Sequence, residues 1–557
     1  MTAVDASPGS RPLVPPAPAE PAREPTAAAT ALRTALLDAP LPLGLPGTGA
    51  LRSRRSQLLE QLDDYLLPRL SAPDRPLLVV VGGPTGVGKS TLVNTLVGEV
   101  VSHSSMIRPT TRSPVLVHHP DDAAWFGRDG ILPAFDRVDA PTHDPGSLQL
   151  VGTPAVPPGV ALIDAPDFDS IDLTNRTLAT RLLAAADMWL FVTSAARYAD
   201  QLPWEQLAIA RERDTPLLVV MNRIPADDLA TVSADLTVQL DARGIGRGKL
   251  VFVQHGPVEE GLLRSPQVAQ IRGALDELSA SPATRRSIAR QCVAGAVAQA
   301  GTVAAAVADA ADEQVAAIGE LLAVVDASYA TARSALLAAL TDGTVLRGEL
   351  RSQWSDLVGT DAALPMTEMV RRVRERLLAT PPERQEARLV RLELALDLAL
   401  EALVADHAER AAGTAARRLR ATGHGDALLS WSDEDLTRPG ARLAARTRQD
   451  VAAWRRGLVD DPAARGIAAA LAVCAIAAPG ADHADHADHA GHAGHADHDQ
   501  QGRGPVAAAR AGLRTTVAAL LDGERDRYLA PVLGWRLTPA APERLRAAGH
   551  GVAGLTS

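Results

Sequence analysis

Short apolar runs alternate with helical patterns through the first half of the chain. Between about residues 75 and 280 these runs read LLVVV, PVLVHH, VALID, MWLFVTS, PLLVVMN and KLVFVQH. Runs of this length, separated by helical stretches, are typical of a mostly parallel sheet with helices on both faces. We therefore predict one α/β domain over 75–280.

Helical spacing replaces the short runs after a serine–proline pair at 281–282, which is typical of a helix start. Apolar residues keep a period near 3.6 from Val293 towards Leu340. At about 1.5 Å per residue this predicts one helix of roughly 90 Å. Gly301 and Gly319 are the two places where such a helix would break.

A second helical block runs from Glu383 to about Leu419, with leucines on one face at 389, 392, 396 and 403. We expect an elongated helical bundle or stalk over 281–465. A helical return is predicted over 504–557.

The pattern before residue 75 has two parts. Residues 1–49 are rich in proline and alanine and show no sustained period, so we expect a disordered tail there. Leucines at 51, 58, 62 and 66 then keep a near-helical spacing. This spacing predicts a leading amphipathic helix over 50–74 that packs on the domain after it.

An uncharged apolar segment interrupts the helical half at 466–480. Its core, GIAAALAVCAIAA, is too short to span a bilayer, which takes about 20 residues. The segment is either a buried helix of the bundle or a tip that touches lipid. It has no aromatic anchor and no flanking basic cluster, which favours the buried helix.

A low-complexity loop over 481–503 carries six histidines at a strict spacing of three, from His483 to His498. Imidazoles of this kind bind Zn²⁺ or Ni²⁺, or respond to pH. However, a step of three drifts about 60° per histidine around a helix, so the six cannot share one face. Tandem Ala-Asp-His triplets favour a solvated linker over a metal site.

Composition changes this picture in two respects. The 557 residues carry 56 Lys and Arg against 66 Asp and Glu, a net charge of -10, so no nucleic-acid partner is expected. The two cysteines, Cys292 and Cys474, lie far apart, and the first residues lack the order of a secretory signal. We expect a cytoplasmic protein.

The chemistry is concentrated in the loop after the first run, LLVVVGGPTGVGKSTLVNTLVG. It matches G-x-x-x-x-G-K-S/T between a strand and a helix, where backbone N–H groups and a helix start hold phosphate. Lys89 should reach the β and γ phosphates, and the Ser90 hydroxyl should take one magnesium position. The predicted nucleotide-binding residues of the loop are Gly83, Pro84, Thr85, Gly86, Val87, Gly88, Lys89, Ser90 and Thr91.

Two downstream motifs separate the classes of phosphate-binding loop proteins. RPTTRSPVLV places Thr111 in a loop before a strand, where the first switch of a GTPase supplies a threonine to magnesium and the γ-phosphate. VALIDAPDFDS ends a strand on Asp164, which is placed to hold magnesium through water. Lys89, Thr111 and Asp164 are thus the predicted catalytic residues, and Ser90, Thr111 and Asp164 the predicted metal site.

At this point the chain resembles the P-loop GTPases of the translation-factor-related class, above all Era-like and dynamin-like bacterial GTPases of an actinobacterial type. The resemblance covers about residues 75–260. It implies binding and hydrolysis of GTP with Mg²⁺ as cofactor. The helical remainder resembles dynamin-like proteins in architecture alone.

Three positions depart from the family's pattern. Asp167 stands at the glycine of D-x-x-G, Phe168 stands where Ras-like enzymes have glutamine, and Gly86 stands where related enzymes have serine or asparagine. The source of catalytic help is therefore open. Arg108 and Arg112 could neutralise charge in the transition state, or they are solvated arginines of a switch loop.

Base recognition departs as well. The expected N-K-x-D appears as Asn222-Arg223-Ile-Pro, so the asparagine and a cationic stem are present and the carboxylate is missing. Asp227 or Asp228 could replace it only if the loop bends back. Loss of that contact relaxes selectivity, so GTP is favoured and ATP stays open.

Three functions follow as hypotheses. The first is a GTPase whose helical half responds to the nucleotide, slow unless G domains associate in a homo-oligomer, and peripheral at the membrane at most. The second is an ATP-using P-loop NTPase, although no L-S-G-G-Q signature is present. The third is a nucleotide-responsive scaffold with little hydrolysis.

Overall fold

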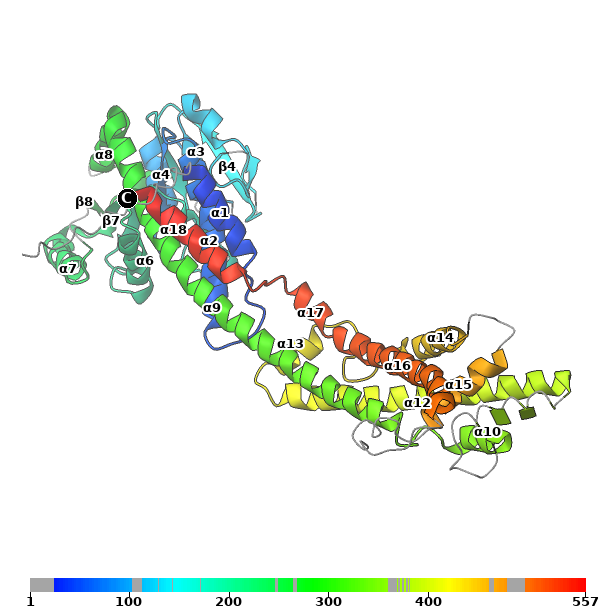
Figure 1. Cartoon of the computed structure of the whole chain (residues 1–557). Helices are drawn as coiled ribbons and strands as arrows, with labels where there is room; N and C mark the ends of the chain where they lie inside the picture. The colour runs from blue at the N-terminus through cyan, green and yellow to red at the C-terminus, as the bar shows by residue number, and fades with distance from the viewer. Residues whose placement is uncertain are drawn as a thin grey trace, which may run out of the picture. The chain divides into compact units, whose positions relative to one another are not determined.

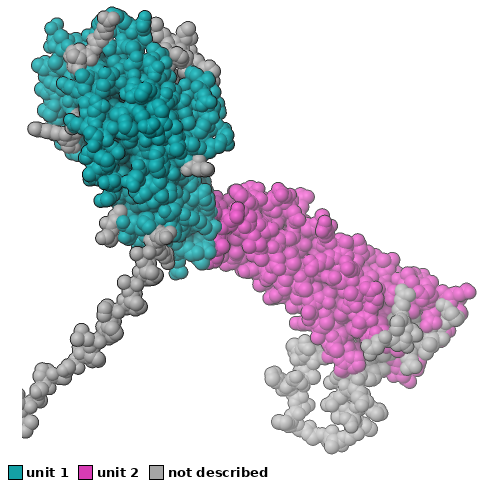
Figure 2. All heavy atoms as spheres, turned by 90° about the horizontal axis from the view of Figure 1, so that it is seen from above, with its two compact units in different colours: residues 1–39, 50–309, 540–557 teal, residues 40–49, 310–539 magenta. Residues whose placement is uncertain are grey.

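The computed structural model describes residues 25–556 apart from 103–112, 129, 143, 171, 246–248, 264–267, 460–464, 478–495 and parts of 359–380. The chain divides into two compact units, each assembled from separate stretches of sequence (Figure 2). Unit 1 contains residues 1–39, 50–309 and 540–557, and unit 2 contains residues 40–49 and 310–539.

An eight-stranded sheet forms the centre of unit 1, in the order β3-β4-β2-β5-β1-β6-β7-β8. Its strands are β1 (Leu77–Gly82), β2 (Val115–His118), β3 (Asp136–Val138), β4 (Ser147–Gly152), β5 (Val160–Asp164), β6 (Met188–Ser194), β7 (Leu217–Ile224) and β8 (Lys249–Gln254). β9 (Val258–Glu259) and β10 (Leu262–Leu263) form a separate antiparallel pair.

Neighbouring strands of this sheet are parallel except where β2 meets β5. The mostly parallel sheet predicted from the apolar runs is confirmed, and all six runs form strands. The sequence pattern missed β3 and β4. β3 is a three-residue strand at the sheet edge, and β4 beside it is only partly buried and contains polar residues, so neither has the continuous apolar run of a central strand.

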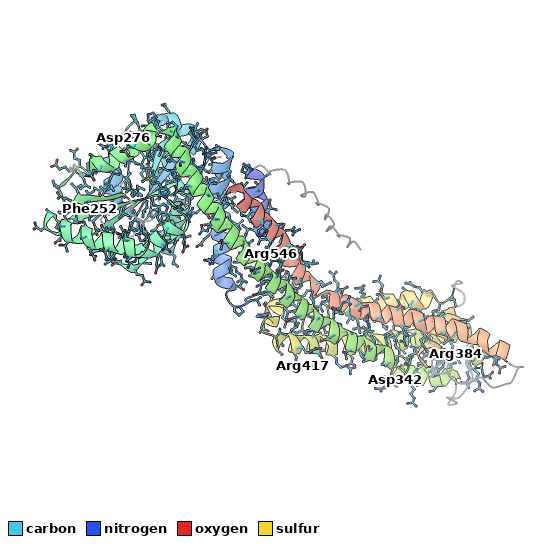
Figure 3. The ribbon with its side chains drawn as sticks, turned by 60° about the vertical axis from the view of Figure 1, so that its left-hand side comes forward. Phe252, Asp276, Asp342, Arg384, Arg417 and Arg546 are labelled. Atoms are coloured by element: carbon cyan, nitrogen blue, oxygen red, sulfur yellow. The ribbon has the colours of Figure 1, made fainter. Side chains whose placement is uncertain are left out.

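Helices cover both faces of the sheet (Figure 1). One apolar cluster joins Val79 and Val81 of β1 to α4 and α8, and a second joins Phe191 and Val219 to α6 and α7. Figure 3 labels Phe252 on β8 and Asp276 on α8. The helices are α4 (Lys89–Val97), η2 (Pro120–Phe126), α5 (Leu173–Ala184), α6 (Gln201–Glu212), η3 (Ala226–Asp228), α7 (Leu229–Ala242) and α8 (Val268–Ala280).

The first described helix, α1 (Pro25–Leu37), corrects the prediction of a tail up to residue 49. Its buried positions Ala28, Ala29, Leu32 and Leu36 follow helical spacing and pack on α18 (Ala541–Ala553) and α3 (Leu67–Ser71). The tail prediction is wrong from Pro25 onward because the face of this alanine-rich helix is completed by residues near the other end of the sequence. Residues 1–24 lie outside the described chain.

The leading helical stretch runs through α2 (Thr48–Gln61), the π-helical turn η1 (Leu62–Leu66) and α3. Leu58, Leu62 and Leu66 of the predicted stripe are buried. Two polar side chains, Tyr65 and Arg69, contact the carboxylate of Asp187 at the start of β6. The stretch is thereby fixed to the sheet by a buried polar cluster as well as by its leucines.

The long predicted helix is α9 (Pro282–Ala339), and it continues through both Gly301 and Gly319. Ser281 accepts the N–H of Thr284 at 3.2 Å, the contact expected of an N-cap. The contact of α9 with α18 is tight at Gly549, where a Cβ would lie 3.1 Å from that of Ala304 on α9. Small residues at this contact let the two helices approach closely.

An ion pair links α9 to α18 within unit 1, and α9 is also long and apolar. Arg546 of α18, labelled in Figure 3, lies 2.7 Å from Asp309 of α9. By length and composition α9 could cross a membrane, and 28% of its most apolar 18 residues are buried in the structure. Core helices of soluble proteins meet the same criteria.

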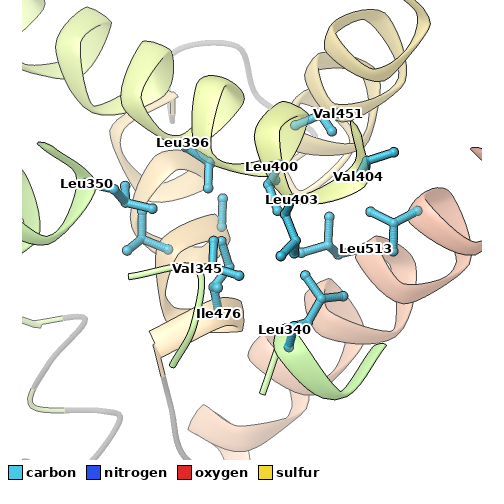
Figure 4. Close-up of a cluster of buried hydrophobic side chains, with 14 of the residues drawn as sticks. Leu340, Val345, Leu350, Leu396, Leu400, Leu403, Val404, Val451, Ile476 and Leu513 are labelled. Atoms are coloured by element: carbon cyan, nitrogen blue, oxygen red, sulfur yellow. The ribbon is translucent and has the colours of Figure 1, made fainter. Parts of the chain in front are cut away.

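Unit 2 is helical. Its core joins the end of α9 to side chains of α10, α12, α14, α15 and α16 (Figure 4). Arg384 and Arg417, labelled in Figure 3, lie near the two ends of α12. Its helices are α10 (Gly348–Val358), α12 (Pro382–Arg420), α13 (Gly425–Ser430), α14 (Leu443–Arg456), α15 (Arg465–Ala477), α16 (Ala496–Asp526) and α17 (Leu529–Gly534).

The uncharged segment predicted at 466–480 is α15 for most of its length. Ala472, Val473, Cys474 and Ile476 are buried in the unit 2 core, as expected for a bundle helix. Figure 4 labels Ile476 among the side chains of this core. The histidines from 483 to 495 lie outside the described residues, so the choice between linker and metal site stays a prediction.

Candidate nucleotide-binding site

The loop between β1 and α4 holds its shape through three glycines. A Cβ on Gly83 would lie 2.2 Å from the carbonyl oxygen of Val192 in β6, so only glycine fits. Gly86 and Gly88 have φ angles of 80° and 90°, which L side chains rarely adopt. A Cβ on Gly88 would also lie 2.7 Å from Nδ2 of Asn222. The glycines of the motif are thus required by the backbone and its neighbours.

Lys89 begins α4 and is buried, with 6% of its surface exposed. Its Nζ donates to the carbonyl oxygens of Gly83, at 3.0 Å, and Pro84, at 3.2 Å. The third partner is the carboxylate of Asp167, which forms an ion pair with Nζ. The ammonium is therefore held above its own loop, in the position from which it would meet a phosphate.

Asp164 ends β5 beside this lysine and is also buried. Its Oδ2 accepts a hydrogen bond of 2.6 Å from the Ser102 hydroxyl, and Ser90 bonds the same carboxyl group. Its Oδ1 has no hydrogen-bond partner in the part of the chain that the structure describes. Burial raises the pKa of this carboxyl, opposed by the serine hydrogen bonds and by the charge of Lys89.

The residues present fit a magnesium ion. A buried carboxylate oxygen without a partner and a serine hydroxyl bonded to the same group are hard oxygen ligands, the kind that Mg²⁺ prefers. A divalent cation would also offset the cost of burying the Asp164 charge. Ser90 would hold it directly and Asp164 directly or through water.

Ser102 is a site residue that the sequence reasoning missed. Asn94 of α4 fixes it: Oδ1 of Asn94 accepts the N–H of Ser102 at 2.9 Å, and Nδ2 donates to its carbonyl at 2.7 Å. Both residues are buried. No local motif marks Ser102, because its contact with Asp164 joins positions 62 residues apart.

The segment that follows β5, residues 165–170, also contacts the phosphate-binding loop through Asp169. Its Oδ1 accepts from the backbone N–H and the hydroxyl of Thr85, both at 2.6 Å. Arg197 lies 3.9 Å from its other oxygen. Two carboxylates of one short loop, Asp167 and Asp169, thus bind two donors of the candidate site.

Phe168 between them turns the other way. It is 4% exposed and stacks on Phe191 of β6, with ring centroids 5.9 Å apart. The side chain at this position is therefore part of the apolar core between sheet and helices. This gives a structural reason for an apolar residue where Ras-like enzymes have glutamine.

The candidate base-recognition residues end β7. Asn222 is buried and donates from Nδ2 to the carbonyl of Val87 at 2.8 Å. Arg223 has a φ of 57° and donates to the carbonyl of Gly86 at 2.9 Å. Both side chains thus support the phosphate-binding loop. Asp227 and Asp228 lie in η3 with exposed surfaces.

The structure brings together the predicted residues of the phosphate-binding loop, Asp164 and Asn222. Val87 is fully buried behind the loop, Thr85 and Pro84 are buried in it, and Thr91 lies half-buried in the first turn of α4. Thr111, Arg108 and Arg112 lie outside the described residues, so the roles given to them stay predictions.

The comparison with protein families decides the class of this domain. The model of the 50S ribosome-binding GTPases matches residues 78–223, from β1 to β7. The chain contains a P-loop GTPase domain. The predicted class is confirmed for this part of the chain, which includes the glycine loop, Asp164 and Asn222.

Two curated GTPases are similar to part of this chain. GTPase Era of Neisseria meningitidis serogroup C is 29% identical over 158 residues, which are 27% of this chain and 38% of that protein. The small ribosomal subunit biogenesis GTPase RsgA of Carboxydothermus hydrogenoformans is 34% identical over 112 residues, 19% of this chain and 34% of that protein. The chain therefore spans less than two fifths of the length of these relatives.

Two solved structures align beyond the GTPase domain. One, from an oligomerised bacterial dynamin pair, covers 71% of this chain and 77% of its own, with 12% identity and a TM-score of 0.28. LeoA, a bacterial dynamin GTPase from ETEC, covers 97% of this chain and 96% of its own, with 12% identity and a TM-score of 0.24. These TM-scores are too low to bear on function.

Proposed function

We propose that this protein binds GTP in the loop between β1 and α4 and hydrolyses it with magnesium. The observation that supports this most is the placement of a buried Lys89 near a buried Asp164, one oxygen of which has no partner among the described residues. In this proposal Lys89 binds the β and γ phosphates, while Ser90 and Asp164 hold the metal. The backbone N–H groups before α4 complete the phosphate site.

Magnesium would neutralise charge that builds up on the phosphate oxygens during transfer to water. The chain's own residues position the reactants: α4 presents its N-terminus, and Asn94 and Ser102 orient the Asp164 carboxylate. Phe168 cannot orient water while it is stacked in the core. We therefore propose slow hydrolysis by the isolated chain, accelerated when neighbouring GTPase domains associate.

GTP is favoured over ATP by the family of the domain and by the position of Asn222. The margin should be small, because the motif lacks the carboxylate that normally pairs with guanine. The helical half would respond through α9, which is one continuous helix from Pro282 to Ala339. We propose action in the cytoplasm, with peripheral membrane contact at most.

Competition binding tests the proposal. A fluorescent GTP analogue is bound to the full chain in magnesium and displaced with unlabelled GTP or ATP, with Lys89→Ala as the control that should not bind. Stronger displacement by GTP supports a GTPase, and equal displacement makes the chain a P-loop NTPase without base preference. Binding to Lys89→Ala as tight as to the wild type would refute the assigned site.

A further inference from the structure

The carboxylates of Asp167 and Asp169 occupy the donors that a nucleotide would need. Asp167 pairs with Nζ of Lys89, and Asp169 binds the backbone N–H of Thr85. The ammonium and the loop N–H groups are the two kinds of donor with which such loops hold phosphate. Two carboxylates of the chain itself are thus bound to donors of the kinds that hold phosphate in such loops.

These contacts are well defined and come from one segment. The side chains of Lys89 and Asp169 are 6% and 12% exposed, so water weakens the contact of Asp169 little, whereas Asp167 is 35% exposed and its ion pair is partly screened. Both carboxylates follow the magnesium candidate Asp164 within five residues. Between them, Phe168 is stacked in the core, which holds the loop against the site.

We propose that Asp167 and Asp169 act as an internal competitor for the nucleotide's phosphates, so that binding requires residues 165–170 to leave the glycine loop. This deepens the proposed function and rests on it. Two carboxylates and a polyphosphate repel one another, so they cannot share Lys89 and Thr85 without cost. The free chain is therefore in a closed form, which lowers the apparent affinity for nucleotide.

The geometry offers the released loop another partner. Arg197 lies 3.9 Å from Oδ2 of Asp169 and is 44% exposed, so this carboxylate has a cation beside it once Thr85 is taken by phosphate. The competition also favours highly charged ligands. A triphosphate or diphosphate displaces two carboxylates more readily than a monophosphate does, because more of its oxygens meet the same donors.

The test measures binding of mant-GDP and mant-GTP to the full chain, with magnesium and with EDTA. Asp167→Asn/Asp169→Asn removes both competing charges, and Asp167→Gly restores the glycine of the family's pattern. Asp241→Asn, at an exposed position of α7, controls for the loss of one surface charge. Far-UV circular dichroism and thermal melting confirm that each variant is folded.

The double variant is expected to bind mant-GDP about ten-fold more tightly than the wild type in EDTA, because a charge-assisted contact to each donor is lost. Asp241→Asn should bind like the wild type. If the wild type binds nucleotide and both loop variants bind it equally or more weakly, the proposed competition by Asp167 and Asp169 is wrong. The proposal is also wrong if the double variant binds more weakly than the wild type in magnesium and equally in EDTA. That result would make Asp167 a metal ligand.

Failure of the proposed function looks different. In that case neither the wild type nor any loop variant binds mant-GDP or mant-GTP, although all are folded. Binding by a loop variant that the wild type lacks supports both proposals, because removal of the carboxylates has then opened a functional site.

Discussion

Two buried aspartates of the same sheet have opposite surroundings. Asp164 ends β5, and Asp187 directly precedes β6. Their exposed fractions are 7% and 0%, and each lies near a cation. Burial of a carboxylate is costly unless its oxygens are paired, so the two sites can be compared by counting what each oxygen contacts.

Asp187 has partners on both oxygens. Tyr65 donates to Oδ1 at 3.0 Å, the backbone N–H of Leu78 donates to Oδ2 at 2.8 Å, and Arg69 forms an ion pair. These partners come from η1, α3 and β1. The carboxylate therefore joins the leading helical stretch to β1 and to the start of β6, and its role is structural.

Asp164 has hydrogen bonds from two serines, yet none of the described residues contacts its Oδ1 with a hydrogen bond. Lys89 lies near it but forms its ion pair with Asp167. An incompletely satisfied buried charge costs stability, and such groups occur mainly at functional sites. The comparison teaches that a carboxylate oxygen without a partner among the described residues, rather than burial or acidity, distinguishes the candidate site aspartate from the structural one.

The largest expected effect is on the structural aspartate. Asp187→Ala leaves the buried Arg69 charge unpaired and should lower the free energy of unfolding of unit 1 by about 3–5 kcal/mol. Chemical denaturation followed by tryptophan fluorescence measures it, since Trp189 lies beside the change. Asp241→Ala, which changes an exposed residue of α7, is the matched control. A loss below about 1 kcal/mol would show that the cluster is not structural.

Asp164→Asn should give the reverse result. Stability should change by less than about 1 kcal/mol, because the variant removes a buried charge that is poorly compensated. Magnesium-dependent GTP hydrolysis should fall at least about ten-fold, and EDTA should bring the wild type to the level of the variant. Asp187→Asn is the contrast: destabilised, but still stimulated by magnesium. Full turnover by Asp164→Asn would remove this residue from the site.

The sequence pattern predicted the central strands, α9, α12 and the glycine loop because each depends on neighbours in sequence. It missed α1, whose buried face is completed by α18, and the Asp187 cluster, whose partners Tyr65 and Arg69 lie more than 100 residues away. The candidate site shows the same division between local features, which were predicted, and long-range contacts, which were missed. Its motif residues were found, whereas Ser102 and the contacts of Asp169 depend on the fold.

The smallest expected effect concerns Ser102. Ser102→Ala removes the hydrogen bond to Oδ2 of Asp164 and should cost about 1 kcal/mol of stability. Because the serine only orients the carboxylate, magnesium should bind several-fold more weakly while saturating magnesium restores most of the turnover. Ser147→Ala is the matched control, since Ser147 is a buried serine of the same sheet that bonds Asp144 at 2.8 Å. The measurement is GTP turnover against magnesium concentration for both variants. If Ser102→Ala instead needs as much magnesium as the wild type but reaches a lower maximum turnover, the hydroxyl acts on the nucleotide itself. The difference between Asp164 and Asp187 would then not be explained by the partners of the two carboxylates alone.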